Sequence, residues 1–105
     1  MTDEAIKHDK DKLRMDLIPP IFSEWTAEAL GYGAKKYNDY NYKNGKGLTW
    51  MQISAALDRH HTAWKKREDF DAESTLHHLK HASACMAMLV VLVANNIGED
   101  NRYKR

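Results

Sequence analysis

Apolar side chains recur along the chain with the period of an α-helix in three segments. The first segment follows Pro19 and Pro20, which favour a helix start because proline in a first turn loses no intrahelical hydrogen bond. It runs to about Tyr37, and one face collects apolar residues at spacings of four and three: Ile21, Trp25, Ala29 and Tyr32. The pattern predicts one amphipathic helix in this region.

The second helical segment opens at Trp50. Thr49 and Gln52 have the spacing of a capping box, in which each side chain bonds the backbone N–H of the other residue. The apolar stripe that follows includes a histidine: Trp50, Ile53, Leu57, His60 and Trp64. The charged run 65–71 ends the pattern, so the predicted helix carries one imidazole toward the interior.

The third segment begins between Asp71 and Thr75 and continues to about Asn96, where Gly98 is placed to supply a left-handed C-terminal turn. Two neighbouring stripes lie along it: Leu79, Ala82, Met86, Leu89 and Val93 form one, and His78, His81, Cys85, Met88 and Leu92 form the other. A helix that is apolar over most of its girth is central in a bundle or shared with another subunit. If the bundle covers one stripe and a second copy covers the other, the protein is at least a dimer.

The remaining segments are polar: an arm at 1–17, a loop at 38–48 and a tail at 99–105. No run alternates apolar and polar residues as a strand does, and 105 residues are the length of one domain. We therefore predict a single all-α domain over 1–105, a small bundle of three main helices. A chain this short has little room for a deep pocket, so a site shared between subunits is a reasonable expectation.

The net charge and composition of the chain argue against several classes of function. Sixteen Lys and Arg against fifteen Asp and Glu give a net charge of +1, so no overall field recruits nucleic acid or an anionic membrane. Residues 1–12 are too polar for a signal peptide, and the longest apolar run, 82–94, is shorter than the roughly 20 residues that span a bilayer. The lone Cys85 cannot form an internal disulfide. These features predict a cytoplasmic protein with no nucleic-acid or membrane partner.

Histidines give the strongest chemical signal. On the third helix either His78 or His77 shares a face with His81, because positions three and four apart lie together. The stripe that continues from His81 into the apolar run favours His78, so three imidazoles including His60 are expected to converge. Two acids precede this helix closely: Asp71 and Glu73. Imidazole and carboxylate together suit Mn, Zn, Co or Fe. The alternative is a set of hydrogen-bonded core histidines that bind no ligand.

Acid pairs offer a second kind of site. Glu24 with Glu28, and Glu68 with Asp71, could hold Mg²⁺ if the two pairs faced each other, because this ion prefers oxygen ligands. The alternative is that these acids are simply solvated on helix surfaces.

Basic and aromatic residues gather around the loop that follows the first helix. Among them are Lys35, Lys36, Tyr37, Tyr40 and Tyr42. Together with Lys12 and Arg14 of the arm, they could bind phosphates while an aromatic ring stacks on a base. The alternative is an ordinary solvated surface. No motif for a covalent nucleophile accompanies them.

A string of short motifs, in this order, resembles one known family. The motifs span roughly residues 10–89: Lys12-Leu13-Arg14, Asp16-Leu17-Ile18-Pro19, Gly33-Ala34-Lys35-Lys36-Tyr37, Asn41, Trp50, Arg59-His60 with Ala63-Trp64, Glu68-Asp69, Asp71, Glu73-Ser74, His78-Leu79 and His81-Ala82. They are similar to the dATP/dGTP diphosphohydrolase N-terminal domains, small phage and bacterial proteins placed near the MazG-like nucleoside triphosphate pyrophosphohydrolases. The resemblance implies an all-α, MazG-like, oligomeric enzyme, located in the host cytoplasm if a phage encodes it.

The resemblance, together with the acid and histidine patterns, assigns expected roles to individual residues. A divalent metal, Mg or Mn with Co or Zn as further options, is expected on Glu28, Glu68, Asp71, His78 and His81. Residues expected to act in catalysis are His60, Arg59 and Glu73. Residues expected to bind the substrate are Lys12, Arg14, Lys35, Lys36, Tyr37 and Asn41. MazG-like enzymes carry ExxE and ExxD pairs on neighbouring helices, whereas this chain has ExxxE at Glu24/Glu28 and an ExxD in the predicted loop 68–71.

Two functions follow from these expectations. The first is metal-dependent hydrolysis of dATP or dGTP between the α and β phosphates, which gives a monophosphate and pyrophosphate. The alternative is a protein that binds and sequesters a nucleotide or a nucleotide signal without turning it over, since phosphate-binding residues beside an incomplete acid set suit that role. The expected partners are a deoxynucleoside triphosphate and further copies of the chain.

Overall fold

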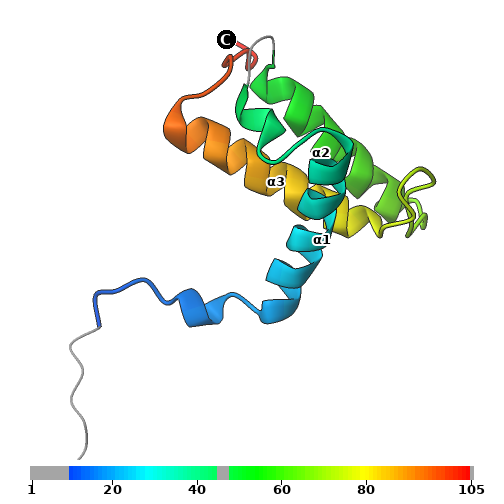
Figure 1. Cartoon of the computed structure of the whole chain (residues 1–105), viewed down its shortest axis with the longest axis horizontal. Coiled ribbons are helices and arrows are strands. Elements are labelled where there is room, and N and C mark those ends of the chain that lie inside the picture. The colour runs from blue at the N-terminus through cyan, green and yellow to red at the C-terminus, as the bar shows by residue number, and fades with distance from the viewer. Residues whose placement is uncertain (1–9, 45–47, 105) are drawn as a thin grey trace, which may run out of the picture.

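The computed structural model describes residues 10–44 and 48–104. In this part of the chain there are three α-helices and no strand beyond two isolated bridges (Figure 1). The helices are α1 (Pro20–Lys36), α2 (Trp50–Lys65) and α3 (His78–Asn95), with short 3-10 turns at η1 (Met15–Leu17) and η2 (Asn41–Asn44). The predicted all-α bundle of three main helices is confirmed for the described residues. The part of the expected polar arm at 1–9 lies outside them.

Helix α2 begins where the sequence predicts and packs along α3. The Thr49 hydroxyl accepts a hydrogen bond from the Gln52 backbone N–H, and the Gln52 side chain accepts one from the Thr49 N–H at 2.8 Å. This capping box satisfies two amides that the first turn leaves without helical partners. The core lies between α2 and α3, where four buried side chains meet: Trp50, Ile53, Cys85 and Leu92.

The segment that follows α3 folds back onto the first turn of α2. The Trp50 indole donates to the Ile97 carbonyl at 2.8 Å, and the Trp50 backbone N–H donates to the Glu99 carbonyl at 2.9 Å. Gly98 lies against this ring at φ +83, and a Cβ there would come within 3.2 Å of the Leu48 carbonyl oxygen. The start of the polar tail is therefore bonded into the bundle.

Helix α1 packs on α3 beyond its first turn. Ala29 is buried, the Thr26 hydroxyl donates to Ser83 at 2.9 Å, and the first turn of α1 projects beyond the bundle (Figure 1). Ile21 and Phe22 in that first turn are more than half exposed, at 56% and 52%. The arm continues away from the other two helices, so α1 is an amphipathic helix whose apolar face is only partly covered.

Helix α3 starts later than its hydrophobic pattern predicts. The expected start between Asp71 and Thr75 is wrong, because these residues form a loop and the helix begins at His78. Thr75 has a positive φ of 63°, and the His77 ring accepts a hydrogen bond from the Leu79 N–H at 3.0 Å, which caps the helix. At the other end Asn96 is the left-handed C-cap, with φ 53° and ψ 48°, and the expected Gly98 follows it with a positive φ of 83°.

The two apolar stripes of α3 differ in burial. The stripe that begins at His78 faces the bundle, and it includes the fully buried Leu92. On the other side three apolar residues remain about half exposed: Met86, Val90 and Val93. Among the described residues α3 alone is long and apolar enough to cross a membrane, with a mean hydropathy of 1.3, although α1 and α2 both pack against it. It is the central helix of the bundle, with one apolar side left open.

Candidate functional site

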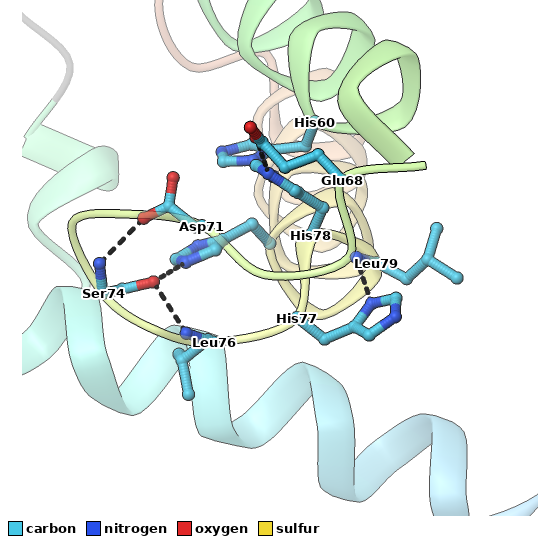
Figure 2. A network of polar contacts seen from close by, with 9 residues as sticks. His60, Glu68, Asp71, Ser74, Leu76, His77, His78 and Leu79 are labelled. Atoms are coloured by element: carbon cyan, nitrogen blue, oxygen red, sulfur yellow. Dashed lines mark hydrogen bonds and ion pairs between the residues drawn. The ribbon is translucent and has the colours of Figure 1, made fainter. Parts of the chain in front are cut away.

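The loop between α2 and α3 holds an acidic segment over the first turns of α3 (Figure 2). Backbone bonds close it tightly: the His78 N–H donates to the Asp69 carbonyl at 2.7 Å, and the Asp71 N–H donates to the Leu76 carbonyl at 2.8 Å. Arg67 and Thr75 both have positive φ, at 72° and 63°. Non-glycine residues in this region cost about 1 kcal/mol or more, so the surrounding contacts impose the loop shape.

His60 from α2 and His78 from α3 face each other at the centre of the site. Their Nδ1 atoms are 2.9 Å apart, and the other ring nitrogen of His78, Nε2, lies 2.6 Å from an oxygen of Glu68. A carboxylate only accepts hydrogen bonds, so Nε2 of His78 carries a hydrogen. The two Nδ1 atoms then share a single hydrogen between them. His78 is only 4% exposed, so these ring contacts satisfy a buried polar side chain.

His81 completes a group of three imidazoles. Its ring stacks on that of His60, with centroids 4.7 Å apart and planes inclined by 16°. The Nε2 atom of His81 lies 2.6 Å from the Ser74 hydroxyl, and Ser74 in turn donates its backbone N–H to a carboxylate oxygen of Asp71 at 2.8 Å (Figure 2). The convergence predicted from the two stripes is observed, and the choice of His78 over His77 is resolved.

His77 points away from this group. Its ring lies against Trp25 and Phe70, with centroid distances of 5.1 and 5.6 Å. The role of His77 is therefore structural, as the cap of α3 and as a link between α1 and the loop.

The cluster has the donor chemistry of a metal site. Ligand atoms of His60, Asp71 and His78 all lie within 4.8 Å of one another. Two nitrogens bound to one tetrahedral ion at about 2.0–2.1 Å are about 3.3 Å apart, so the 2.9 Å contact needs to open only slightly. Glu68 already accepts from the far nitrogen of His78, which is how carboxylates orient the histidine ligands of metals. These residues therefore fit a divalent ion.

Burial and hydrogen bonding keep the cluster in the protonation states that bind metals. Burial lowers the pKa of His60, and the neighbouring His81 and His78 rings lower it further. Burial also lowers the pKa of His81. For Asp71, burial opposes ionisation, but the hydrogen bonds from Ser74 outweigh it and leave the pKa below its ordinary value. These shifts favour the neutral form of the His60 and His81 rings and the ionised form of the Asp71 carboxylate.

Two expected acids lie outside the cluster. Glu28 on α1 pairs with Lys80 at 2.6 Å, and Glu73 pairs with Lys36 at 2.6 Å. Glu24 remains exposed on α1. The acids that the structure brings to the histidines are Asp71 and Glu68, both in the loop as the ExxD spacing suggested.

The expected substrate-binding residues are scattered. Lys12 and Arg14 lie on the arm, which runs away from the bundle, and Arg14 pairs with Asp16 at 2.8 Å (Figure 1). Lys35, Lys36, Tyr37 and Asn41 are exposed at or after the end of α1. Arg59, which was expected to act in catalysis, directly precedes His60 on α2 and lines a cavity together with Glu68.

Sequence reasoning missed Ser74 as the residue that links Asp71 to His81. Its available signal was the D-x-x-S spacing, in which a carboxylate accepts the N–H three residues on and makes a tight turn. Lys80 was also missed, because its partner Glu28 is 52 residues away in the chain.

Comparison with known proteins agrees with the motif pattern. The family model of the dATP/dGTP diphosphohydrolase N-terminal domain matches residues 2–102. A protein of Salmonella phage PMBT28 named dATP/dGTP diphosphohydrolase is 34% identical over 98 residues, which cover 93% of this chain. The chain spans only 33% of that relative's length. No solved structure matches the chain, so a MazG-like arrangement of its helices stays a prediction. The chain belongs to the family of dATP/dGTP diphosphohydrolase N-terminal domains.

Proposed function

We propose that this chain carries a divalent-metal site for the hydrolysis of dATP or dGTP to a monophosphate and pyrophosphate. The observation that carries the proposal is the meeting of His60, Asp71 and His78, with ligand atoms within 4.8 Å of one another. The name of the phage relative supports the substrate class, although that protein is about three times as long as the chain.

In this proposal a bound Mg, Mn, Co or Zn ion supplies Lewis-acid chemistry at the phosphate. His60, His78 and Asp71 hold the ion, and Glu68 fixes the orientation of the His78 ring through its 2.6 Å contact. Three imidazole and carboxylate donors favour Mn, Co or Zn over Mg, which prefers oxygen ligands.

The other residues of the cluster act on position and charge. His81 stacks on His60 and holds that ring in place, while Ser74 anchors both His81 and Asp71. Arg59 lies close enough to the cluster to neutralise charge that develops on the leaving pyrophosphate. Glu73 remains bound to Lys36 and serves to position the loop.

The test is turnover of dATP, dGTP, dCTP and dTTP with each of the four metals, with phosphorus NMR to identify the products. We expect pyrophosphate rather than orthophosphate as the second product and a preference for purine substrates. His60→Ala should abolish turnover, and His61→Ala, the exposed neighbour that stacks on Trp64, should retain it. The absence of turnover with every metal would reject the hydrolase.

The second candidate function is nucleotide sequestration. It is favoured by the pairing of Glu28 and Glu73 with lysines, which leaves few acids at the histidines. Calorimetry separates the two functions: a sequestering protein binds dATP tightly in EDTA and releases it intact, whereas the hydrolase consumes it only with metal.

We also propose that the chain works as a homo-oligomer. Its own bundle leaves apolar residues open on α3, and the arm adds a further exposed apolar run: Leu13, Met15, Leu17 and Ile18. Such contiguous surface is typical of interfaces. Because the arm leaves its own bundle, Lys12 and Arg14 can serve as substrate contacts only at the site of a second copy (Figure 1).

A further inference from the structure

A cavity of about 450 Å³ opens beside the histidine cluster, along α2 and the start of the loop. It is lined by six residues: Asp58, Arg59, Thr62, Ala63, Lys66 and Glu68. Its volume lies within the range of about 300–1,000 Å³ that is usual for small-molecule sites. Of the residues expected at the site, Arg59, expected in catalysis, and Glu68, expected as a metal ligand, line this cavity.

Glu68 connects this cavity to the cluster. One of its carboxylate oxygens contacts His78 at 2.6 Å, and the same residue forms part of the cavity wall. Arg59 precedes His60 directly in the chain, so the cavity and the cluster occupy adjacent strips of α2. Glu68 is therefore the residue that the cavity and the histidine cluster share.

The cations of the cavity are free to bind an anion. In the described part of the chain neither Arg59 nor Lys66 forms an ion pair, whereas the basic residues Lys36, Lys80 and Arg14 each have a carboxylate partner. Thr62 adds a hydroxyl donor on the same wall. The two acids of the lining, Asp58 and Glu68, oppose an anion there, although one oxygen of Glu68 is engaged by His78 at 2.6 Å.

We propose that this cavity binds the polyphosphate chain of the substrate, with Arg59 and Lys66 on the β and γ phosphates and Thr62 as a further donor. The inference rests on the proposed function, since the α phosphate lies at the cluster when the β and γ phosphates lie in the cavity. It assigns phosphate binding to α2 of the same chain and gives Lys66 and Thr62 a role.

The experiment measures binding of inorganic pyrophosphate and tripolyphosphate to the full chain by calorimetry, so that no turnover is needed. Lys66→Ala should weaken tripolyphosphate binding about tenfold, because a charge-assisted hydrogen bond is lost. Arg59→Ala should weaken it by more, roughly 10–100-fold. Asp58→Asn should tighten it about two- to threefold by removing a repelling carboxylate. The matched control is Lys65→Ala, an exposed lysine next in sequence that does not line the cavity.

The outcomes separate this inference from the hydrolase. If the chain turns over dATP while Lys66→Ala and Lys65→Ala bind tripolyphosphate equally, the cavity assignment is wrong and the hydrolase stands. If the chain turns over no nucleotide yet binds tripolyphosphate through Lys66, the cavity assignment stands without the enzyme. Failure of the unaltered chain to bind either polyphosphate also overturns the cavity assignment.

Discussion

The bundle of α2 and α3 and the arm that leads into α1 cover their apolar side chains to very different degrees. Between α2 and α3, Trp50, Ile53, Cys85 and Leu92 are all buried, and the histidine cluster lies at one end of the same interface. On the described part of the arm, from residue 10, and on the first turn of α1, every large apolar residue is at least 45% exposed. One chain is therefore enough to assemble the histidine cluster, but not to cover its own apolar side chains.

The contrast predicts that stability depends on one stripe of α3 and hardly at all on the other. Leu92→Ala removes a fully buried side chain and should lower the free energy of unfolding by about 2–5 kcal/mol. The neighbouring Val93→Ala changes a residue that is 48% exposed and should cost under about 1 kcal/mol. Urea unfolding monitored by circular dichroism measures both. If both variants lost the same free energy of unfolding, the two stripes would not differ in burial.

A second prediction concerns Glu68, whose carboxylate orients the His78 ring in the cluster. Glu68→Gln removes the charge that orients His78 and should lower Mn²⁺ or Zn²⁺ affinity about 10–100-fold. Glu24→Gln, which changes an exposed acid on α1, should leave that affinity unchanged. Calorimetric metal titration measures it. Similar effects of the two substitutions would show that Glu68 contributes only general negative charge.

The pH dependence of the free energy of unfolding should reflect the His60 and His81 rings. The pKa values of His60 and His81 are lowered in the folded chain, so below the ordinary histidine pKa of about 6.5 the unfolded chain binds more protons. The free energy of unfolding should therefore fall as pH decreases from about 6.5 through the lowered values. His60→Gln should flatten this dependence in urea titrations, and His61→Gln should not. A rise in stability on acidification would contradict the assigned shifts.

Substitutions in the arm should have the smallest effect on the free energy of unfolding and the largest effect on oligomer formation. Replacing Leu13, Met15 and Leu17 together by Ser should change the free energy of unfolding of the monomer by under about 0.5 kcal/mol per residue, because all three are exposed. If the chain forms the proposed homo-oligomer, the same change should shift it toward monomer in light scattering after size-exclusion chromatography. An unaltered mass would remove the arm from the interface.

Local signals in the sequence were sufficient for the starts of α1 and α2. Pro20 and the Thr49–Gln52 capping box act through their immediate neighbours, so spacing alone locates them. The start of α3 depends instead on how Asp71 and Leu76 pair across the loop, which no helical periodicity encodes. The helix therefore begins at His78 and not between Asp71 and Thr75.

The site was predictable to the same extent. The inward stripes were enough to bring His60, His78 and His81 together, because helical spacing fixes which side chains share a face. The partners of Glu28 and Glu73 were not predictable, since their lysines come from other elements, 52 and 37 residues away. The cavity beside Arg59 likewise arises from the path of the loop past α2 and has no motif of its own.

The single hydrogen shared by the Nδ1 atoms of His60 and His78 affects how a metal cation can bind between them. A cation that binds both Nδ1 atoms must displace that hydrogen. Metal binding would therefore release a proton from this position. Acid and metal then compete for the same two atoms. Nitrogen-15 spectra of the two rings would register the exchange even if no helix moved.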